Sequence, residues 1–250
     1  MSRPSPAGKY EKWTALTGLP WQTSPVRYGQ YCPVAKAAEV LGERWTLLIV
    51  RDLMEGAHRF NDLHAGLPGI SRTLLSGRLR MLEREGLVER RSGTGHREYW
   101  LTPLGLDLQP AVMSLGEWAV RNYGRDPKRD ELDPEILMLW IERHIHREAL
   151  PPGRFVVRFD FTGERHARAW LVCRDQVPQV CHEDPRLEED LVVTSDLRTL
   201  HRVFAGRLAL AAALRDGSLA LEGTAQARRA FTHWFGLSPF APAAREALAG

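Results

Sequence analysis

Five polar residues within a ten-residue stretch have the side-chain chemistry to read the edges of nucleic-acid bases. They are Ser71, Arg72, Thr73, Ser76 and Arg80. An arginine donates two parallel hydrogen bonds to O6 and N7 of guanine, and serine and threonine hydroxyls bond several base edges. A solvated helix also carries polar residues on its outer face, so the pattern needs support from the elements around it.

A helix must hold these residues on one side, and the sequence contains both a cap and an apolar repeat that indicate such a helix. Ser71 can cap the helix, because its hydroxyl can accept a hydrogen bond from a free backbone N–H of the first turn. Leu75, Leu79 and Leu82 recur at spacings of four and three, which predicts one buried face. Arg78 falls near that apolar face, so we expect a structural ion pair there and no base contact.

A second short helix and a hairpin flank this helix. Phe60 and Leu63 indicate a short amphipathic helix before it, and residues 67–70 (LPGI) indicate a turn. Residues 87–91 and 97–101 read as strands, because two glycines between them allow a tight turn. A helix held in this way can place its N-terminal residues in a major groove. The run predicts a winged helix-turn-helix.

The predicted hairpin is basic around its turn. Arg90, Arg91, His96 and Arg97 cluster there, which suits contact with phosphates or a minor groove, although an ordinary solvated hairpin is the alternative. The formal charge of the chain, +3, is too small to be diagnostic. Residues 59–97 nevertheless carry eight arginines and four acidic residues, whereas residues 127–250 carry 17 basic and 18 acidic residues. The basic excess therefore lies where phosphate neutralisation would require it.

Several sequence blocks occur in an order that points to one family. They are Cys32-Pro33-Val34, GERWTLLI at 42–49, Arg51-Asp52-Leu53, RFNDL at 59–63, Ile70-Ser71, Leu74-Leu75-Ser76, Arg78-Leu79, Tyr99 and LTPLG at 101–105. With these blocks, residues 32 to about 123 resemble the HxlR family of bacterial winged-helix regulators. The resemblance implies a homodimer that binds inverted repeats in double-stranded DNA near promoters, with the face of Ser71, Arg72, Thr73, Ser76 and Arg80 turned to the DNA. The sequence leaves repression or activation open, and we expect a repressor. The full set of expected DNA contacts is Arg59, Asn61, Ser71, Arg72, Thr73, Ser76, Arg80, Arg90, Arg91, His96 and Arg97.

A longer helix is expected after the hairpin. Thr102 can cap it and Pro103 suits its first position, and the helix runs through about Arg121. An apolar stripe at spacings of four and three fits either an intramolecular core or a seam with a partner helix. Similarity to the family favours the seam, which would set two recognition helices about 34 Å apart. The stripe residues are Leu104, Leu108, Val112, Leu115 and Ala119.

The C-terminal half has a different pattern. Phe155, Val157, Phe159 and Phe161 alternate with polar residues, which predicts a half-buried strand over 154–161. The other expected elements are helices over 132–149, after Asp196, over 207–214 and over 224–235, and strands over 167–173, 176–181, 190–194 and 218–222.

A second resemblance rests on looser motifs. They are DLVVT at 190–194, Ser195-Asp196-Leu197, Leu200, Gly206-Arg207-Leu208, AAAL at 211–214 and GSLALEG at 217–223. Residues 132–237 resemble the sterol-carrier-protein-2-like fold, which implies an apolar tunnel for a lipid-like or polyketide-like effector. The aromatic residues could instead simply fill a core, and the whole domain could serve dimerisation alone. The expected lining residues are Phe155, Phe159, Trp170, Phe231, Trp234 and Phe235.

The expected fold class is α+β, with a winged helix-turn-helix domain followed by a sterol-carrier-protein-2-like α/β sandwich. The expected boundaries are an N-terminal arm over 1–25, the DNA-binding domain over 26–124, a polar linker over 125–133 and the second domain over 134–240. The arm carries aromatic residues, so we expect it to dock on the body or on another subunit.

Membrane, metal and catalytic chemistry are not indicated. The sequence has no run of about 20 apolar residues and no signal peptide, so a cytoplasmic protein without a membrane partner is expected. His144 and His146 lie two apart on a predicted helix, which makes a poor metal pair. We find no catalytic motif and expect neither an enzyme nor a bound cofactor or metal.

The three cysteines show no metal-ligand spacing and should be free thiols in a reducing compartment. Cys32 precedes Pro33 and a predicted helix, whose dipole could lower the pKa of the thiol. Some members of the family that the chain resembles sense oxidants or electrophiles through an N-terminal cysteine, so Cys32 is a candidate redox residue. The alternative is a small buried apolar side chain.

Two functions from different classes fit these observations. In the first, the chain is a dimeric transcription factor whose C-terminal domain senses an apolar small molecule. In the second, it carries or sequesters such a molecule, and the winged helix only mediates assembly. The basic turn and the face that carries Arg72 and Arg80 favour the first.

Overall fold

The computed structural model of the chain describes residues 27–92, 96–163 and 166–249. The chain divides into two compact units, Met1–Arg44 and Trp45–Gly250. In the first unit, helix α1 (Pro33–Leu41) begins after Cys32, which is its N-cap residue. The expected arm over 1–25 lies outside the described residues.

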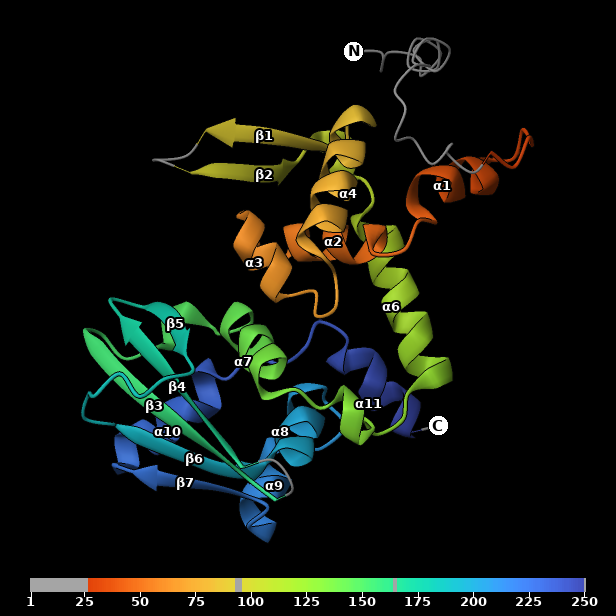
Figure 1. Cartoon of the computed structure of the whole chain (residues 1–250). Helices are drawn as coiled ribbons and strands as arrows, with labels where there is room; N and C mark the ends of the chain where they lie inside the picture. The colour runs from red at the N-terminus through yellow and green to blue at the C-terminus, as the bar shows by residue number, and fades with distance from the viewer. Residues whose placement is uncertain (1–26, 93–95, 164–165, 250) are drawn as a thin grey trace, which may run out of the picture. The chain divides into compact units, whose positions relative to one another are not determined.

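The second unit begins with a winged helix-turn-helix. Its elements are α2 (Thr46–Met54), α3 (Phe60–Ala65), α4 (Arg72–Arg84), β1 (Val88–Ser92) and β2 (Arg97–Leu101) (Figure 1). Leu75, Leu79 and Leu82 are buried on one face of α4, as their spacing predicts. The Ser71 hydroxyl accepts a hydrogen bond from the backbone N–H of Leu74 at 3.2 Å, so the predicted cap is confirmed. This element order confirms the fold predicted for the segment.

The hairpin is joined to the helices through both of its strands. Gly86, after α4, has a φ of +71°, a left-handed conformation that favours glycine, and the chain turns there into β1. β1 and β2 pair antiparallel over their whole lengths. The backbone N–H of Tyr99 donates to the carbonyl of His58 at 2.7 Å, and Arg59 forms a β-bridge with Glu98. The hairpin is thereby joined to the segment that enters α3.

The single helix expected after the hairpin is in fact two. Thr102 caps α5 (Pro103–Leu106) as predicted, with its hydroxyl 3.2 Å from the N–H of Gly105. The chain then starts again as α6 (Gln109–Tyr123), which has Pro110 in its first turn. Proline lacks the backbone N–H that a continuous helix needs, and it suits the first turn of a new one. The expectation of one helix was therefore wrong at this point.

The predicted apolar stripe is only partly exposed: Leu104 and Leu115 are exposed, whereas Leu108, Val112 and Ala119 are half-buried. No residue of α6 is buried, and Leu115 and Trp118 are 47% and 49% exposed. The C-terminal helix α11 (Ala241–Ala249), which was not predicted from the sequence, packs on α6. A Cβ atom at Gly116 would overlap the ring of Phe240, so the two segments meet closely there.

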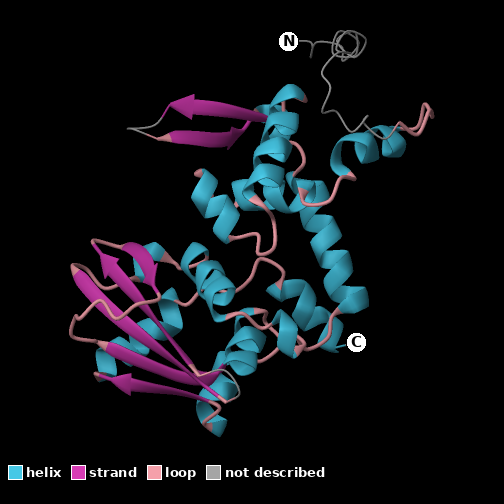
Figure 2. Cartoon of the chain, in the orientation of Figure 1, coloured by secondary structure: helices cyan, strands magenta, loops and turns pink. Residues whose placement is uncertain are grey.

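The C-terminal half contains one five-stranded sheet with helices (Figure 2). The strand order is β5-β4-β3-β6-β7, in which β3 and β6 run parallel and all other neighbours run antiparallel. The elements are α7 (Pro134–Arg143), β3 (Arg154–Thr162), β4 (Ala167–Arg174), β5 (Val177–Cys181), β6 (Leu191–Asp196), α8 (Leu197–Phe204), α9 (Leu210–Asp216), β7 (Leu219–Gly223) and α10 (Ala225–Trp234).

The main apolar core lies on one face of this sheet. Phe155, Val157, Phe159 and Phe161 of β3 are all buried in it, which confirms the predicted alternation. Buried residues of α7 to α10 complete the same core. The opposite face carries a smaller apolar cluster of Val156, Trp170 and Val172, partly covered by Cys181 and Leu187.

The helix expected over 132–149 is shorter than predicted. Asp133 caps α7, and the helix ends at Arg143 before a 3₁₀ turn at Arg147–Ala149. Tertiary contacts explain the break, because the N–H of His146 donates to the carbonyl of Trp234 at 3.0 Å. No helix within the described ranges is long and apolar enough to cross a membrane.

Candidate nucleic-acid interface

The exposed face of α4 carries the predicted base-reading side chains. Ser71, Arg72, Thr73 and Arg80 are exposed, and Ser76 is half-buried. The cap at Ser71 leaves the first turn of α4 at the surface, where a helix N-terminus favours contact with negative charge. Arg78, also half-buried, lies on the helix beside the buried leucine face, where the helical wheel placed it.

Helix α3 orients the first arginine of this face. Nη1 of Arg72 donates to Oδ1 of Asn61 at 3.1 Å, and its guanidinium lies 5.8 Å from the centre of the Phe60 ring. The structure therefore brings Asn61 next to Arg72. Arg59, the N-cap residue of α3, is exposed where the β-bridge joins this segment to the hairpin.

Two wing arginines are engaged by carboxylates. Arg90 pairs with Glu83 at the end of α4, and Nη2 of Arg91 lies 2.7 Å from Oε1 of Glu89. The hydrogen bond to Glu83 raises the pKa of Arg90 above its ordinary value, so this side chain stays cationic. A phosphate bound by either arginine would compete with its carboxylate partner for the positive charge.

Aromatic contacts also hold the base of the wing. Arg91 lies 4.8 Å from the centre of the Trp100 ring, and His58 stacks on that ring at 3.5 Å. His96 and Arg97 are exposed at the start of β2. The glycine-containing tip at 93–95 lies outside the described residues, so the predicted turn is not described.

The predicted ligand-lining aromatics do not form one group. Phe155, Phe159, Phe231, Trp234 and Phe235 are buried in the main core. The ring of Phe231 lies 4.9 Å from that of Trp234 and 5.0 Å from that of Phe235. Trp170 lies on the opposite face of the sheet, because it is one residue out of phase with the inward-facing positions of β4.

The cysteines occupy unlike environments. Cys32 is partly exposed at the start of α1, and Cys181 is partly exposed on β5. Cys173 is buried, and burial raises the pKa of its thiol to about 12. The described residues include no cluster of His, Cys, Asp or Glu side chains that could hold a metal ion.

An ion-pair group between α2 and α7 was not predicted from the sequence. Asp52 of α2 is completely buried, and its Oδ1 lies 2.7 Å from Nη2 of Arg51 and 3.6 Å from Nη1 of Arg143. Both guanidinium groups lie over the Trp140 ring, at 4.6 and 5.3 Å from its centre. Burial raises the pKa of Asp52, although the two arginines act in the opposite direction.

A second contact extends this group. Nε2 of His144 lies 3.1 Å from Oε2 of Glu55, and its Nδ1 lies 2.8 Å from the carbonyl oxygen of Trp140. We call these six residues the α2–α7 joint: Arg51, Asp52, Glu55, Trp140, Arg143 and His144. The sequence signal for this joint is the single aspartate in the largely apolar helix TLLIVRDLM, because a buried aspartate needs a partner. His144, which was expected to make a poor metal pair with His146, is thus an ion-pair partner of Glu55.

Comparison with known proteins places the segment in a family. A family model described as HxlR-like helix-turn-helix matches residues 40–127. The chain is 42% identical over 94 residues to the uncharacterized HTH-type transcriptional regulator YvaP of Bacillus subtilis, covering 36% of this chain and 87% of that protein. It is 33% identical over 119 residues to the uncharacterized HTH-type transcriptional regulator YtfH of Escherichia coli, covering 46% of this chain and 86% of that protein.

Other relatives are matched over a smaller part of their length. An uncharacterized HTH-type transcriptional regulator of Mycobacterium tuberculosis is 47% identical over 88 residues, which is 34% of this chain, and the match spans about half (55%) of that relative. Among solved structures, the reduced form of the transcriptional regulator YodB from B. subtilis is 34% identical, with 37% of this chain and 95% of that chain covered and a TM-score of 0.34. The relatives named here are regulators and not enzymes, which agrees with the lack of a catalytic motif in the sequence. The chain belongs to the HxlR family of helix-turn-helix transcriptional regulators.

Proposed function

We propose that this protein is a DNA-binding transcriptional repressor that acts as a homodimer on an inverted-repeat operator. One observation carries the proposal: the serine-capped start of α4 is exposed, and it presents Arg72, Thr73 and Arg80 beside a basic wing. A capped helix with an exposed N-terminal turn suits insertion into the major groove. The family to which the chain belongs supports the same function.

The side chains divide by role. On α4, Arg72 and Arg80 read guanine through paired hydrogen bonds, and Ser71, Thr73 and Ser76 contact bases or phosphates through hydroxyls. The wing and the start of α3 contact the backbone, because arginines there neutralise phosphates without reading sequence. These backbone contacts come from Arg59, Asn61, Arg90, Arg91, His96 and Arg97.

Exposed apolar side chains on and just before α6 support a homodimer. Leu115, Trp118 and Tyr123 are 47%, 49% and 69% exposed, and Leu104 before α6 is 46% exposed. A run of large exposed apolar side chains along one helix is typical of a surface that a partner covers. A twofold dimer through α6 sets the two α4 helices about one turn of DNA apart.

The C-terminal half is proposed as a sterol-carrier-protein-2-like domain over 134–240 that senses an apolar effector, joined by the segment 125–133 to the DNA-binding domain over 26–124. A sheet with helices packed on one face supports this proposal. The α2–α7 joint offers a route for sensing, because α7 belongs to the C-terminal core and α2 supports the winged helix.

The experiment is a binding assay on DNA. Operators are selected from a random pool with the full chain, and affinity is measured by fluorescence anisotropy at fixed salt. Arg72→Ala and Arg80→Ala should each weaken specific binding by about 1–3 kcal/mol and relax the preferred sequence. The matched control is Arg215→Ala, an exposed arginine on α9 outside the proposed surface.

Sequence-specific binding that survives both changes would remove α4 as the recognition helix. If no DNA sequence is selected, and organic extracts of the purified protein yield an apolar molecule by mass spectrometry, the carrier function replaces the proposed one.

A further inference from the structure

The face of the sheet opposite the main core carries a hollow beside its edge strand. Its volume is about 260 Å³, and it lies over β4 and β5, partly covered by the segment that follows β5. Apolar side chains form part of its wall, and polar groups line the rest. The main lining residues are Val172, Val177 and Leu187, with Arg174, Gln179 and Cys181.

Two arginines stand directly opposite each other at the end of this face. Arg154 of β3 is the register partner of Arg174 of β4, so their side chains project on the same side of the sheet. Both are exposed, and no ion pair is found for either within the described ranges. Like charges directly opposite each other on neighbouring strands repel, so this pair is left electrostatically uncompensated.

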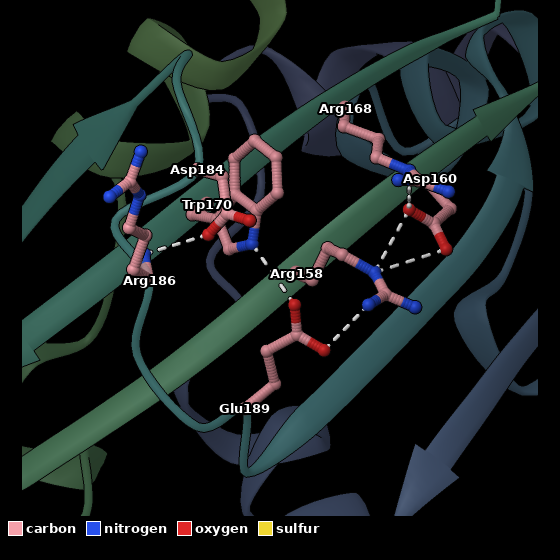
Figure 3. Close-up of polar contacts among 7 residues, drawn as sticks. All are labelled: Arg158, Asp160, Arg168, Trp170, Asp184, Arg186 and Glu189. Carbon is pink, nitrogen blue, oxygen red and sulfur yellow. Dashed lines mark hydrogen bonds and ion pairs between the residues drawn. The ribbon is translucent and has the colours of Figure 1, made fainter.

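The other arginines of the same face are fully compensated (Figure 3). Nη1 of Arg158 lies 2.6 Å from Oε2 of Glu189, and its Nε lies 3.0 Å from Oδ1 of Asp160. Nε of Arg168 lies 3.2 Å from the same Oδ1 of Asp160. On this face, Arg158 and Arg168 have carboxylate partners, whereas Arg154 and Arg174 have none within the described ranges. Arg174 lines the hollow, and Arg154 is its neighbour on β3.

The covering segment has a fixed conformation near the hollow. The backbone N–H of Arg186 donates to Oδ1 of Asp184 at 2.7 Å, which forms a turn around Pro185 (Figure 3). Further along the same segment, Oε1 of Glu189 accepts a hydrogen bond from the indole N–H of Trp170 in β4 at 3.1 Å. Leu187 packs on the cluster that includes Val172, so the apolar wall belongs to a built part of the fold.

We propose that this hollow binds a small amphipathic carboxylate, with the carboxylate on Arg174 and Arg154 and the apolar part against Val172 and Leu187. The planar guanidinium group matches a carboxylate with two parallel hydrogen bonds. The volume is slightly below that of pockets for drug-sized ligands, which limits the ligand to a short chain or one ring. This hollow would be the site at which the proposed effector binds. Its role in regulation rests on the proposed effector sensing.

The first test is calorimetric titration of the full chain with octanoate, using hexanoate and phenylacetate as further probes. Arg174→Gln should weaken octanoate binding about tenfold, because a charge-assisted hydrogen bond is lost. Arg154→Gln should act in the same direction, and octanol should bind more weakly than octanoate. The matched control is Arg168→Gln, which changes an arginine of the same face that already has a carboxylate partner.

The second test locates the bound molecule. Cys181 lines the hollow, whereas Cys32 lies in the other compact unit and Cys173 is buried. Saturating octanoate should slow alkylation of Cys181 by iodoacetamide and leave Cys32 unchanged, as measured by peptide mass spectrometry. Absence of binding by all three carboxylates, equal binding by the arginine variants, or unprotected Cys181 would each overturn the site.

The DNA assay separates this proposal from the proposed function. If octanoate binds at the hollow and alters operator affinity, both are supported. If it binds there with no effect on operator affinity, the site stands and sensing through it is rejected. If specific DNA binding is lost in Arg72→Ala while carboxylates do not bind, the regulator stands and the site is rejected.

Discussion

Arg143 of α7 places Nη1 3.6 Å from Oδ1 of Asp52 in α2, and both side chains are shielded from solvent. The exposed fraction is 9% for the arginine side chain and zero for the aspartate. A buried charge is tolerated only when it is paired, because removing it from water costs several kcal/mol. The helix that supports the winged helix and the first helix of the C-terminal core are therefore electrostatically dependent on each other.

Asp52→Ala should lower the free energy of unfolding by about 3 kcal/mol, because it leaves the Arg143 guanidinium buried without its carboxylate. Urea unfolding followed by tryptophan fluorescence measures the loss. The control is Glu117→Ala, which removes an exposed partner of Arg121 at 3.5 Å and should cost less than about 1 kcal/mol. Equal losses in the two variants would contradict the role of the buried pair.

Two glycines should respond oppositely to alanine. A Cβ atom at Gly66 would overlap Oδ2 of Asp52 and lie 3.2 Å from Nη2 of Arg143, so Gly66→Ala should destabilise the fold. Gly77, inside α4, has nothing within 4 Å of such an atom. Gly77→Ala should raise the thermal midpoint and add about 0.5–1 kcal/mol of stability. A stable Gly66→Ala variant would mean that the joint is looser than described.

The pair of His144 and Glu55 should stabilise the protein in a limited pH window. Burial alone would lower the pKa of His144, but the hydrogen bonds to Glu55 and to the Trp140 carbonyl outweigh it, so the pKa is raised above 6.5. Burial would raise the pKa of Glu55, and the contact with His144 lowers it below 4.5. The histidine contribution is complete below pH 6.5 and is lost as pH rises through the folded value, whereas the glutamate contribution is complete above pH 4.5 and is lost as pH falls.

His144→Gln should therefore destabilise the protein most between these limits. The expected difference from the unsubstituted chain is roughly 1 kcal/mol at about pH 5.5, and it should shrink at about pH 8.5. Denaturant unfolding at both pH values measures it. His166→Gln, at an exposed position, serves as the control and should give no such difference. A constant cost of His144→Gln across this range would rule out the charged pair.

The carboxylate of Glu83 should restrain the wing. Because Arg90 pairs with Glu83 in the free protein, Glu83→Gln should release Arg90 for a phosphate and raise DNA affinity several-fold at low salt. The gain should disappear in the Glu83→Gln, Arg90→Gln double variant, which fluorescence anisotropy can measure at several salt concentrations. A gain of the same size in the double variant would show that Glu83 acts by general repulsion of DNA.

The sequence predicts best those features that depend on local pattern. The leucine spacing of α4, the caps at Ser71 and Thr102 and the alternation in β3 each follow from a repeat that one element imposes. The break before α6 was overlooked, although Pro110 is visible in the sequence. The exposure of one face of α4 is likewise a local property that the sequence predicts, whereas the role of its residues in DNA binding stays a prediction.

Features that depend on contacts between distant segments were not predictable in this way. The pairing of Asp52 with Arg143 joins positions about ninety residues apart, and neither residue has a local pattern that specifies the other. The early end of α7 depends on a backbone hydrogen bond between His146 and Trp234. By contrast, the face on which Trp170 lies was predictable from the alternation along β4, because the odd-numbered neighbours of Trp170 face the core.

The α2–α7 joint also decides how this protein can be dissected in the laboratory. A fragment that ends before α7 keeps Asp52 and Arg51 but loses Arg143 and the Trp140 ring that lies beneath both guanidinium groups. A fragment that begins at α7 keeps the arginine and exposes it without its carboxylate. Fragments cut in the polar stretch around residue 128 for crystallisation or NMR would therefore expose a surface that is buried in the whole chain, and such fragments are best expressed together.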